Sequence, residues 1–129
     1  MTEILLDTHV WFWYLTGSRR LGARLRRVVD SRVDSLWLSS ISVWELGMLA
    51  AKGRVRIAGD YRAWRARAAE MLPVRIAPVD VEIALTSLHV DLAHRDPADR
   101  FIAATAVVHG LALATQDARL AGLGWLPTA

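Results

Sequence analysis

HRDPADRFIAATAVV (residues 94–108) predicts the start of a buried helix. Asp96 suits the N-cap, because its side chain can accept hydrogen bonds from the first-turn N–H groups. Pro97 suits the first helical position, where a missing N–H costs nothing. Residues 101–108 are apolar except Thr105, so we expect the helix to be buried on nearly all sides. Asp99 is needed for neither role, and a buried carboxylate there is costly unless a positive charge, such as a metal ion, meets it.

The composition is that of one globular domain, spanning residues 1–129. Of its residues, 53% are hydrophobic and 22% charged, which is enough to bury a core. There is no cysteine, which excludes disulfides and thiolate metal sites. No apolar run approaches the roughly 18 residues of a membrane span, and the N-terminus lacks the pattern of a signal peptide, so we expect a cytoplasmic protein with no membrane association. The net charge is +3, and every basic residue except Lys52 is Arg, which suits phosphate or carboxylate contacts.

Short apolar runs alternate with helical patterns along the chain. The apolar runs predict strands at 3–6, 35–38, 74–77 and 111–114, with a weak terminal strand near Trp125. Capping residues and helical spacing predict helices at 9–15, 19–32, 60–72, 80–88, 97–110 and 117–120, and one that opens at 39–42 and ends at Gly53. Continuous apolar strands that alternate with helices are typical of a parallel sheet covered on both faces. We therefore predict an α/β fold.

Four acidic residues are expected at one edge of this sheet. Asp7 directly follows the first strand, and Asp117 closely follows the fourth. Glu45 lies about one turn into the helix after the second strand, and Asp99 lies in the first turn of the helix before the fourth. In an open parallel sheet, functional groups gather beyond the carboxyl ends of the strands, near the point where strand order reverses. Four carboxylates gathered there would raise one another's pKa, so a cation is expected among them.

Each acid also has a purely structural interpretation. Asp7 and Asp117 could cap the helices that follow them, and Ser42-Val-Trp-Glu45 fits a capping box. The convergence of all four favours a metal site. A ligand set of oxygen atoms suits Mg²⁺ or Mn²⁺ and not zinc, and such an ion can activate water and neutralise charge on a phosphodiester. Thr8 and Thr115 either orient a ligand or water or are ordinary turn and cap hydroxyls.

Four stretches occur in register along nearly the whole chain: LLDTHVW (5–11), SISVWEL (40–46), DPADRFIAATA (96–106) and LATQD (113–117). In this order and spacing they resemble PIN-domain ribonucleases, and among these the VapC-type toxins of bacterial toxin–antitoxin pairs. The resemblance implies a three-layer α/β/α sandwich with a small central parallel sheet. It also implies Mg²⁺- or Mn²⁺-dependent cleavage of RNA, such as tRNA or rRNA. The implied partners are a VapB-type antitoxin that wraps and inhibits the toxin, and a second copy in a homodimer.

The resemblance places the four acids on the family's metal-binding positions. We expect Asp7, Asp99 and Asp117 to hold one metal, with Glu45 beside it. Glu45 either helps to hold a second metal or accepts a proton from the attacking water. Asp96 is either a further acid of the site or only a helix cap.

Arg100 and His94 are less directly assigned. Arg100 could hold a substrate phosphate or pair with an acid such as Asp96, and we expect the pair. His94 could contact phosphate, although a hydrogen-bonded, non-catalytic state is expected for it and for His9.

Several other side chains allow two interpretations. Trp11, Trp13 and Tyr14 crowd the first helix and cannot all face the core, and we expect an interface there in preference to stacking on RNA bases. The helix that opens at 39–42 is expected to turn an apolar stripe toward the core: Ile41, Trp44, Met48 and Ala51. Two groups of arginines are expected to be solvated helix faces: Arg20, Arg24 and Arg27, and Arg62, Arg65 and Arg67.

Other functional classes fit less well. An aspartyl-phosphate phosphohydrolase needs a second acid two residues after the nucleophile, and His9 occupies that position. A phospho-receiver module needs a lysine at the end of a late strand, and the only lysine is Lys52. A nuclease of RNA processing or decay, and a non-catalytic binding module of the same fold, remain as alternatives.

Overall fold

The computed structural model describes residues 2–92 and 96–129, and its centre is a small parallel sheet. The four strands are β1 (Ile4–Leu6), β2 (Leu36–Ser39), β3 (Arg75–Ala77) and β4 (Ala112–Ala114). They lie in the order β3-β2-β1-β4, and every pair is parallel, with Leu5 opposite Trp37 on one side and Leu113 on the other. The predicted α/β fold with a parallel sheet is confirmed.

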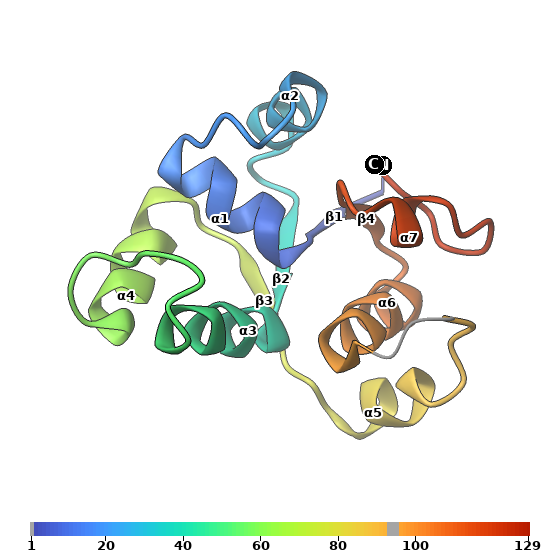
Figure 1. The fold of residues 1–129 in the computed structure, drawn as a ribbon. Helices are drawn as coiled ribbons and strands as arrows, with labels where there is room; N and C mark the ends of the chain where they lie inside the picture. The colour runs from blue at the N-terminus through green and yellow to red at the C-terminus, as the bar shows by residue number, and fades with distance from the viewer. Residues whose placement is uncertain (1, 93–95) are drawn as a thin grey trace.

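Helices cover both faces of the sheet (Figure 1). They are α1 (Thr8–Thr16), α2 (Ala23–Ser31), α3 (Ser40–Ala51), α4 (Tyr61–Met71), α5 (Val81–Ser87), α6 (Pro97–His109) and α7 (Ala118–Ala121). Alternate strand residues point to opposite faces, so Ile4 and Leu6 join a core with α1, α2 and α4, whereas Leu5 joins a core with α5, α6 and α7. The result is the expected three-layer α/β/α sandwich.

The chain order reverses beside β1. From β1 it moves outward through β2 to β3, and it then returns through α5 and α6 to place β4 on the other side of β1. The carboxyl ends of β1 and β4 are therefore neighbours, and the backbone N–H of Asp7 donates to the carbonyl of Ala114 at 3.0 Å. A crevice forms at such a reversal because the connections leave in opposite directions.

Two predicted elements differ from the observed ones. The helix expected at 19–32 begins only at Ala23, with Gly22 as its N-cap, so Arg20 lies in the preceding loop. The terminal strand predicted near Trp125 is wrong: this segment makes only an isolated bridge between Leu113 and Thr128.

The surface of α3 also differs from the prediction. Its buried residues are Ser42 and Leu46, whereas Trp44 is 53% exposed and Met48 is 37% exposed. Trp44, Met48 and Ala51 of the predicted stripe are therefore exposed, and of its members only Ile41 packs against the core. Within residues 2–92 and 96–129, none of the helices combines the length and hydropathy of a membrane span.

Candidate active site

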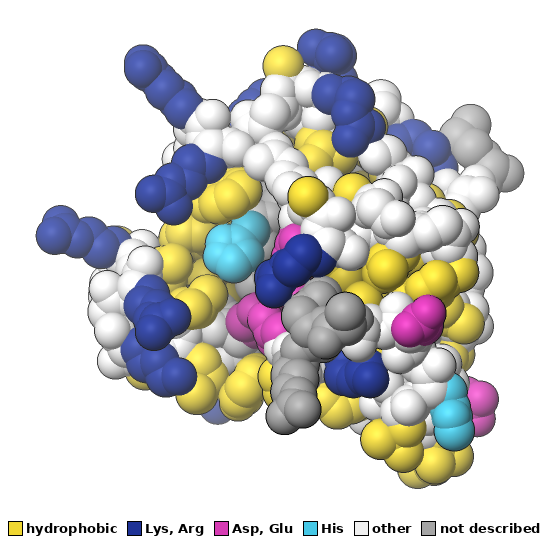
Figure 2. All heavy atoms as spheres, turned by 45° about the vertical axis from the view of Figure 1, so that its right-hand side comes forward, with side chains coloured by type: hydrophobic (Ala, Val, Ile, Leu, Met, Phe, Trp, Pro, Cys, Tyr) yellow, Lys and Arg dark blue, Asp and Glu magenta, His cyan; other side chains and the backbone are white. Residues whose placement is uncertain are grey.

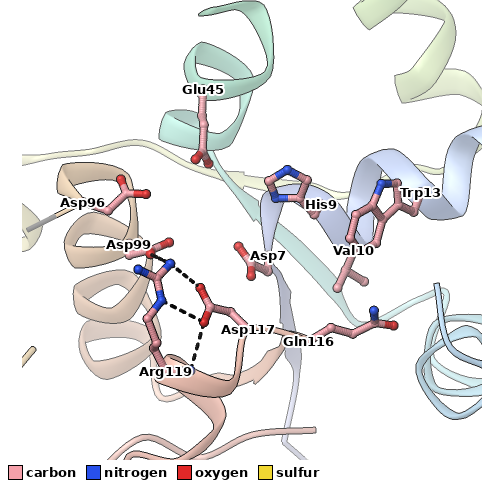
Figure 3. A pocket seen from close by; sticks show the side chains of 10 residues that line it. All are labelled: Asp7, His9, Val10, Trp13, Glu45, Asp96, Asp99, Gln116, Asp117 and Arg119. Atoms are coloured by element: carbon pink, nitrogen blue, oxygen red, sulfur yellow. Dashed lines mark hydrogen bonds and ion pairs between the residues drawn. The ribbon is translucent and has the colours of Figure 1, made fainter. Parts of the chain in front are cut away.

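A pocket opens at the carboxyl edge of the sheet, beside the reversal of strand order. Its volume is about 280 Å³. Figure 3 shows carboxylates from the end of β1, from α3, from the start of α6 and from the loop after β4 around one space. The acidic lining residues are Asp7, Glu45, Asp96, Asp99 and Asp117. The predicted convergence of the four acids is confirmed as an arrangement in space.

Asp7 is held by two hydrogen bonds at the end of β1. Its Oδ1 accepts from the backbone N–H of Thr8 at 2.8 Å, which makes it the N-cap of α1, and its Oδ2 accepts from the Thr115 hydroxyl at 2.6 Å. The residue is only 7% exposed. Burial raises the pKa of the Asp7 carboxyl, and the two hydrogen bonds partly oppose this rise. The charge of Asp117 raises the pKa further, so the site favours an added cation.

Glu45 projects from the second turn of α3 into the same pocket (Figure 3). The capping-box interpretation of Glu45 is wrong, because the N-cap of α3 is Ser39, whose hydroxyl accepts from the N–H of Ile41. Ser42 instead lies buried inside the helix and accepts a hydrogen bond from the Thr8 hydroxyl at 2.8 Å. Burial raises the pKa of Glu45 to about 7, and the charges of Asp96 and the other pocket acids add to the rise.

One arginine side chain, that of Arg119, contacts both Asp99 and Asp117. The guanidinium of Arg119 donates to both carboxylate oxygens of Asp117, from Nε at 3.1 Å and from Nη2 at 2.8 Å. The same Nη2 lies 3.7 Å from Asp99, which is only 6% exposed (Figure 3). Hydrogen bonding to Asp117 raises the pKa of Arg119. Arg119 therefore offsets part of the charge that the acids gather.

The chemistry of this donor set fits a hard divalent cation. The acidic side chains that line the pocket offer carboxylate oxygens, and two of them have raised pKa values because burial disfavours their charged forms. In the described part of the chain, however, no three acidic or histidine side chains already stand in a metal-binding group. Arg119 donates to both carboxylate oxygens of Asp117, so a metal bound by Asp117 would compete with the guanidinium for these atoms.

The remaining predicted residues fall into three groups. Thr115 belongs to the acid network, since its hydroxyl donates to Asp7 and accepts from the N–H of Asp117 at 3.0 Å. Thr8 is fully buried, and a hydrogen bond from its side chain partly opposes the rise in the pKa of Glu45. Asp96 caps α6 through the N–H of Ala98 and also lines the pocket.

Arg100 does not face the acids as expected. Its guanidinium donates to the carbonyl of Val90 at 3.1 Å, and within the described residues no ion pair joins it to Asp96. The prediction that it pairs with this acid is not supported by the geometry. His94 lies outside the described residues.

Two pocket residues were missed at the sequence level. One is Arg119, which lies two positions after Asp117 at the start of α7, where a side chain can turn back to the N-cap. The other is Gln116, whose amide accepts from the N–H of Gly22 at 2.6 Å and donates to the carbonyl of Arg20 at 2.9 Å. Gln116 thereby fastens the loop between α1 and α2 to the loop that carries Asp117.

The aromatic residues of α1 have separate environments. Trp11 is 2% exposed and belongs to the core, so it is not available to the interface that we expected on this helix. Tyr14 donates to Asp30 and lies under the guanidinium of Arg26. Of these three residues, Trp13 alone lines the acidic pocket.

Comparison with known proteins gives consistent matches. Residues 4–126 match the family model described as the PIN domain. Ribonuclease VapC22 of Mycobacterium tuberculosis (strain ATCC 25618 / H37Rv) is 36% identical over 121 residues, which cover 93% of this chain and 91% of the relative. FitAcB from Neisseria gonorrhoeae is 30% identical, with a TM-score of 0.63 over 89% of this chain and 88% of the solved chain. DNA-bound VapBC from Salmonella typhimurium is 18% identical and shares the fold, with a TM-score of 0.71 over 100% of this chain and 98% of the solved chain.

Proposed function

The chain belongs to the PIN-domain family, and we propose that it is a metal-dependent endoribonuclease that acts in the cytoplasm as the toxin of a VapBC-type toxin–antitoxin pair. The observation that carries the proposal is the meeting of four acids from four separate elements in one pocket: Asp7, Glu45, Asp99 and Asp117. The name of the 36% identical relative, a ribonuclease, supports the same activity.

We assign the metal to the inner part of the pocket. Asp7, Asp99 and Asp117 would hold Mg²⁺ or Mn²⁺, because their carboxylates come from the two strand ends and the helix start that meet at the reversal of strand order. When bound, such an ion would activate a water molecule and neutralise charge on the phosphodiester. Arg119 competes for the same oxygen atoms of Asp117.

Glu45 is proposed as the general base. Its carboxylate faces the pocket from the side opposite α7, and its pKa of about 7 suits proton transfer at neutral pH. The base accepts the proton of the attacking water, and the new P–O bond forms as the bond to the leaving 3′ or 5′ oxygen of the RNA breaks. Thr115 holds Asp7 in place through its hydroxyl.

Cleavage of total RNA by the purified protein tests this function. We expect discrete fragments with Mg²⁺ or Mn²⁺, and none with EDTA. The Asp7→Asn protein should give no fragments, although asparagine keeps the helix cap. A well-folded protein that is free of bound partner and cuts no RNA with either metal would refute the nuclease and favour a binding module.

The proposed protein partners require apolar surface, which two helices provide. Trp44 and Met48 on α3 are proposed to contact the VapB-type antitoxin. The exposed surface formed by Val81 and Leu85 of α5 and by its C-cap Leu88 is proposed as the homodimer contact. The solved relatives named above include a VapBC complex and FitAcB, which supports an antitoxin as a partner.

A further inference from the structure

A second, more open groove continues from the acidic pocket across α1. Its volume is about 540 Å³. It shares part of its lining with the acidic pocket, namely His9, Trp13, Glu45 and Asp96. Figure 2 shows acidic side chains in a hollow of this surface with Lys and Arg side chains on its rim. An extended ligand that leaves the acidic pocket in this direction must therefore pass over the groove.

The far part of the groove is basic. Arg20 comes from the loop before α2, and Arg54 comes from the segment after α3. Both residues are exposed, and within residues 2–92 and 96–129 no ion pair engages either guanidinium. Guanidinium groups bind phosphate through paired N–H donors. The charge along the groove thus changes from acidic at the cleavage site to basic beside it.

The wall between these two parts is aromatic. His9 and Trp13 are one helical turn apart on α1, and their ring centroids are 5.2 Å apart at an angle of 48° (Figure 3). Phe12, Leu49 and Val55 complete the apolar lining. Exposed aromatic rings beside a basic groove are the usual surface for unpaired nucleobases.

Gln116 fixes the basic part relative to the acids. Its two hydrogen bonds, to Gly22 and Arg20, join the loop that carries Arg20 to the loop that carries Asp117. The backbone position of Arg20 is therefore coupled to that of Asp117 through one side chain.

We propose that this groove binds the single-stranded RNA segment next to the scissile phosphate. A nucleobase stacks on His9 and Trp13, and the flanking phosphates contact Arg20 and Arg54. The inference rests on the proposed nuclease function. It is favoured over docking of a protein segment because the groove is continuous with the pocket in which the RNA is cut.

Fluorescence anisotropy with a short fluorescein-labelled single-stranded RNA, in EDTA, tests the binding without cleavage. The double variant Arg20→Gln/Arg54→Gln should bind more weakly, and its dependence of log K on log salt should be shallower by about 1.4, since each phosphate contact to a single strand contributes about 0.7. The matched variant Arg27→Gln/Arg62→Gln also removes two charges, but from helices outside the groove, and should keep the wild-type slope. Equal salt slopes for the two double variants would overturn the proposal.

Trp13 gives a second, independent measurement. We expect Trp13→Leu to weaken RNA binding roughly tenfold, and Trp13→Phe to restore most of the affinity because a stacking surface remains. In the cleavage assay, the groove variants should raise KM for RNA more than they lower kcat. Wild-type protein that cuts no RNA would refute the nuclease itself. Normal KM in all groove variants of an active nuclease would refute only the RNA groove and assign it to a protein segment.

Discussion

Replacing Glu45 with Gln should stabilise the metal-free protein at neutral and alkaline pH. The side chain is half-buried among other acids, and its pKa is raised from 4.5 to about 7. The folded state therefore binds a proton that the unfolded state has already lost between these pH values. Because the folded state holds more protons, stability falls as the pH rises through this window. Gln stays neutral at every pH, so the variant should not lose stability in this window.

The size of the effect follows from the shift. One pKa unit corresponds to about 1.4 kcal/mol, so the full shift of Glu45 corresponds to about 3.4 kcal/mol. Solvent screening of a half-buried group reduces this to about 1–2 kcal/mol. For a domain of this size, the variant should unfold about 3–8 °C above the wild type at pH 8. The two proteins should unfold at similar temperatures near pH 4.5, where both side chains are neutral.

Thermal unfolding in EDTA between pH 4.5 and pH 8.5, followed by circular dichroism, measures this difference. Glu70→Gln is the matched control, because Glu70 is exposed on α4 and its removal should give no pH-dependent change. The electrostatic argument fails if the Glu45→Gln protein is less stable than the wild type at pH 8. It also fails if the difference between the two proteins is the same at every pH.

Three further predictions concern metal binding, the acid network and assembly. Arg119→Gln should bind Mn²⁺ severalfold more tightly than the wild type by calorimetry, since a competing cation is removed. The control Arg27→Gln should bind Mn²⁺ as the wild type does. Equal Mn²⁺ affinities in all three proteins would show that the guanidinium of Arg119 does not compete. Thr115→Val removes the hydroxyl that donates to Asp7, so the free energy of unfolding should fall by about 1–2 kcal/mol in denaturant titrations. Because this hydrogen bond lowers the pKa of Asp7, its loss should also move the acid limb of the cleavage pH profile to higher pH. An acid limb at the wild-type pH would show that Thr115 does not hold the Asp7 pKa down. Leu85→Glu places a charge on the exposed face of α5 and should give a monomer by light scattering where the wild type gives a dimer. A variant that stays dimeric would refute this contact.

The convergence of the acids could be predicted from sequence because it depends on a general property of parallel sheets. Once β1 and β4 were identified, their carboxyl ends had to lie at one edge, and Asp7 and Asp117 came with them. The helix start at Asp96 and Pro97 was equally readable, because its capping chemistry is local.

The residues that were missed depend on contacts distant in sequence or on the direction of a side chain. Ser42 is buried on α3 because its hydroxyl meets Thr8, a partner 34 residues away, so helical periodicity alone placed Trp44 inside. Gln116 bonds a loop 94 residues away. Arg119 could have been predicted from sequence, since an arginine two residues after an N-cap acid can fold back to donate to that acid, here Asp117.

Capping and metal binding are not competing interpretations of these acids. Asp7 and Asp117 are the N-caps of α1 and α7, and capping aims their carboxylates at the point where the helices begin, which is also the reversal of strand order. The positive ends of the helices offset part of the repulsion among the acids. Asp99 and Glu45 are not the N-caps of their helices, since Asp96 caps α6 and Ser39 caps α3. Their substitution by Asn and Gln should therefore remove activity while the helices stay intact.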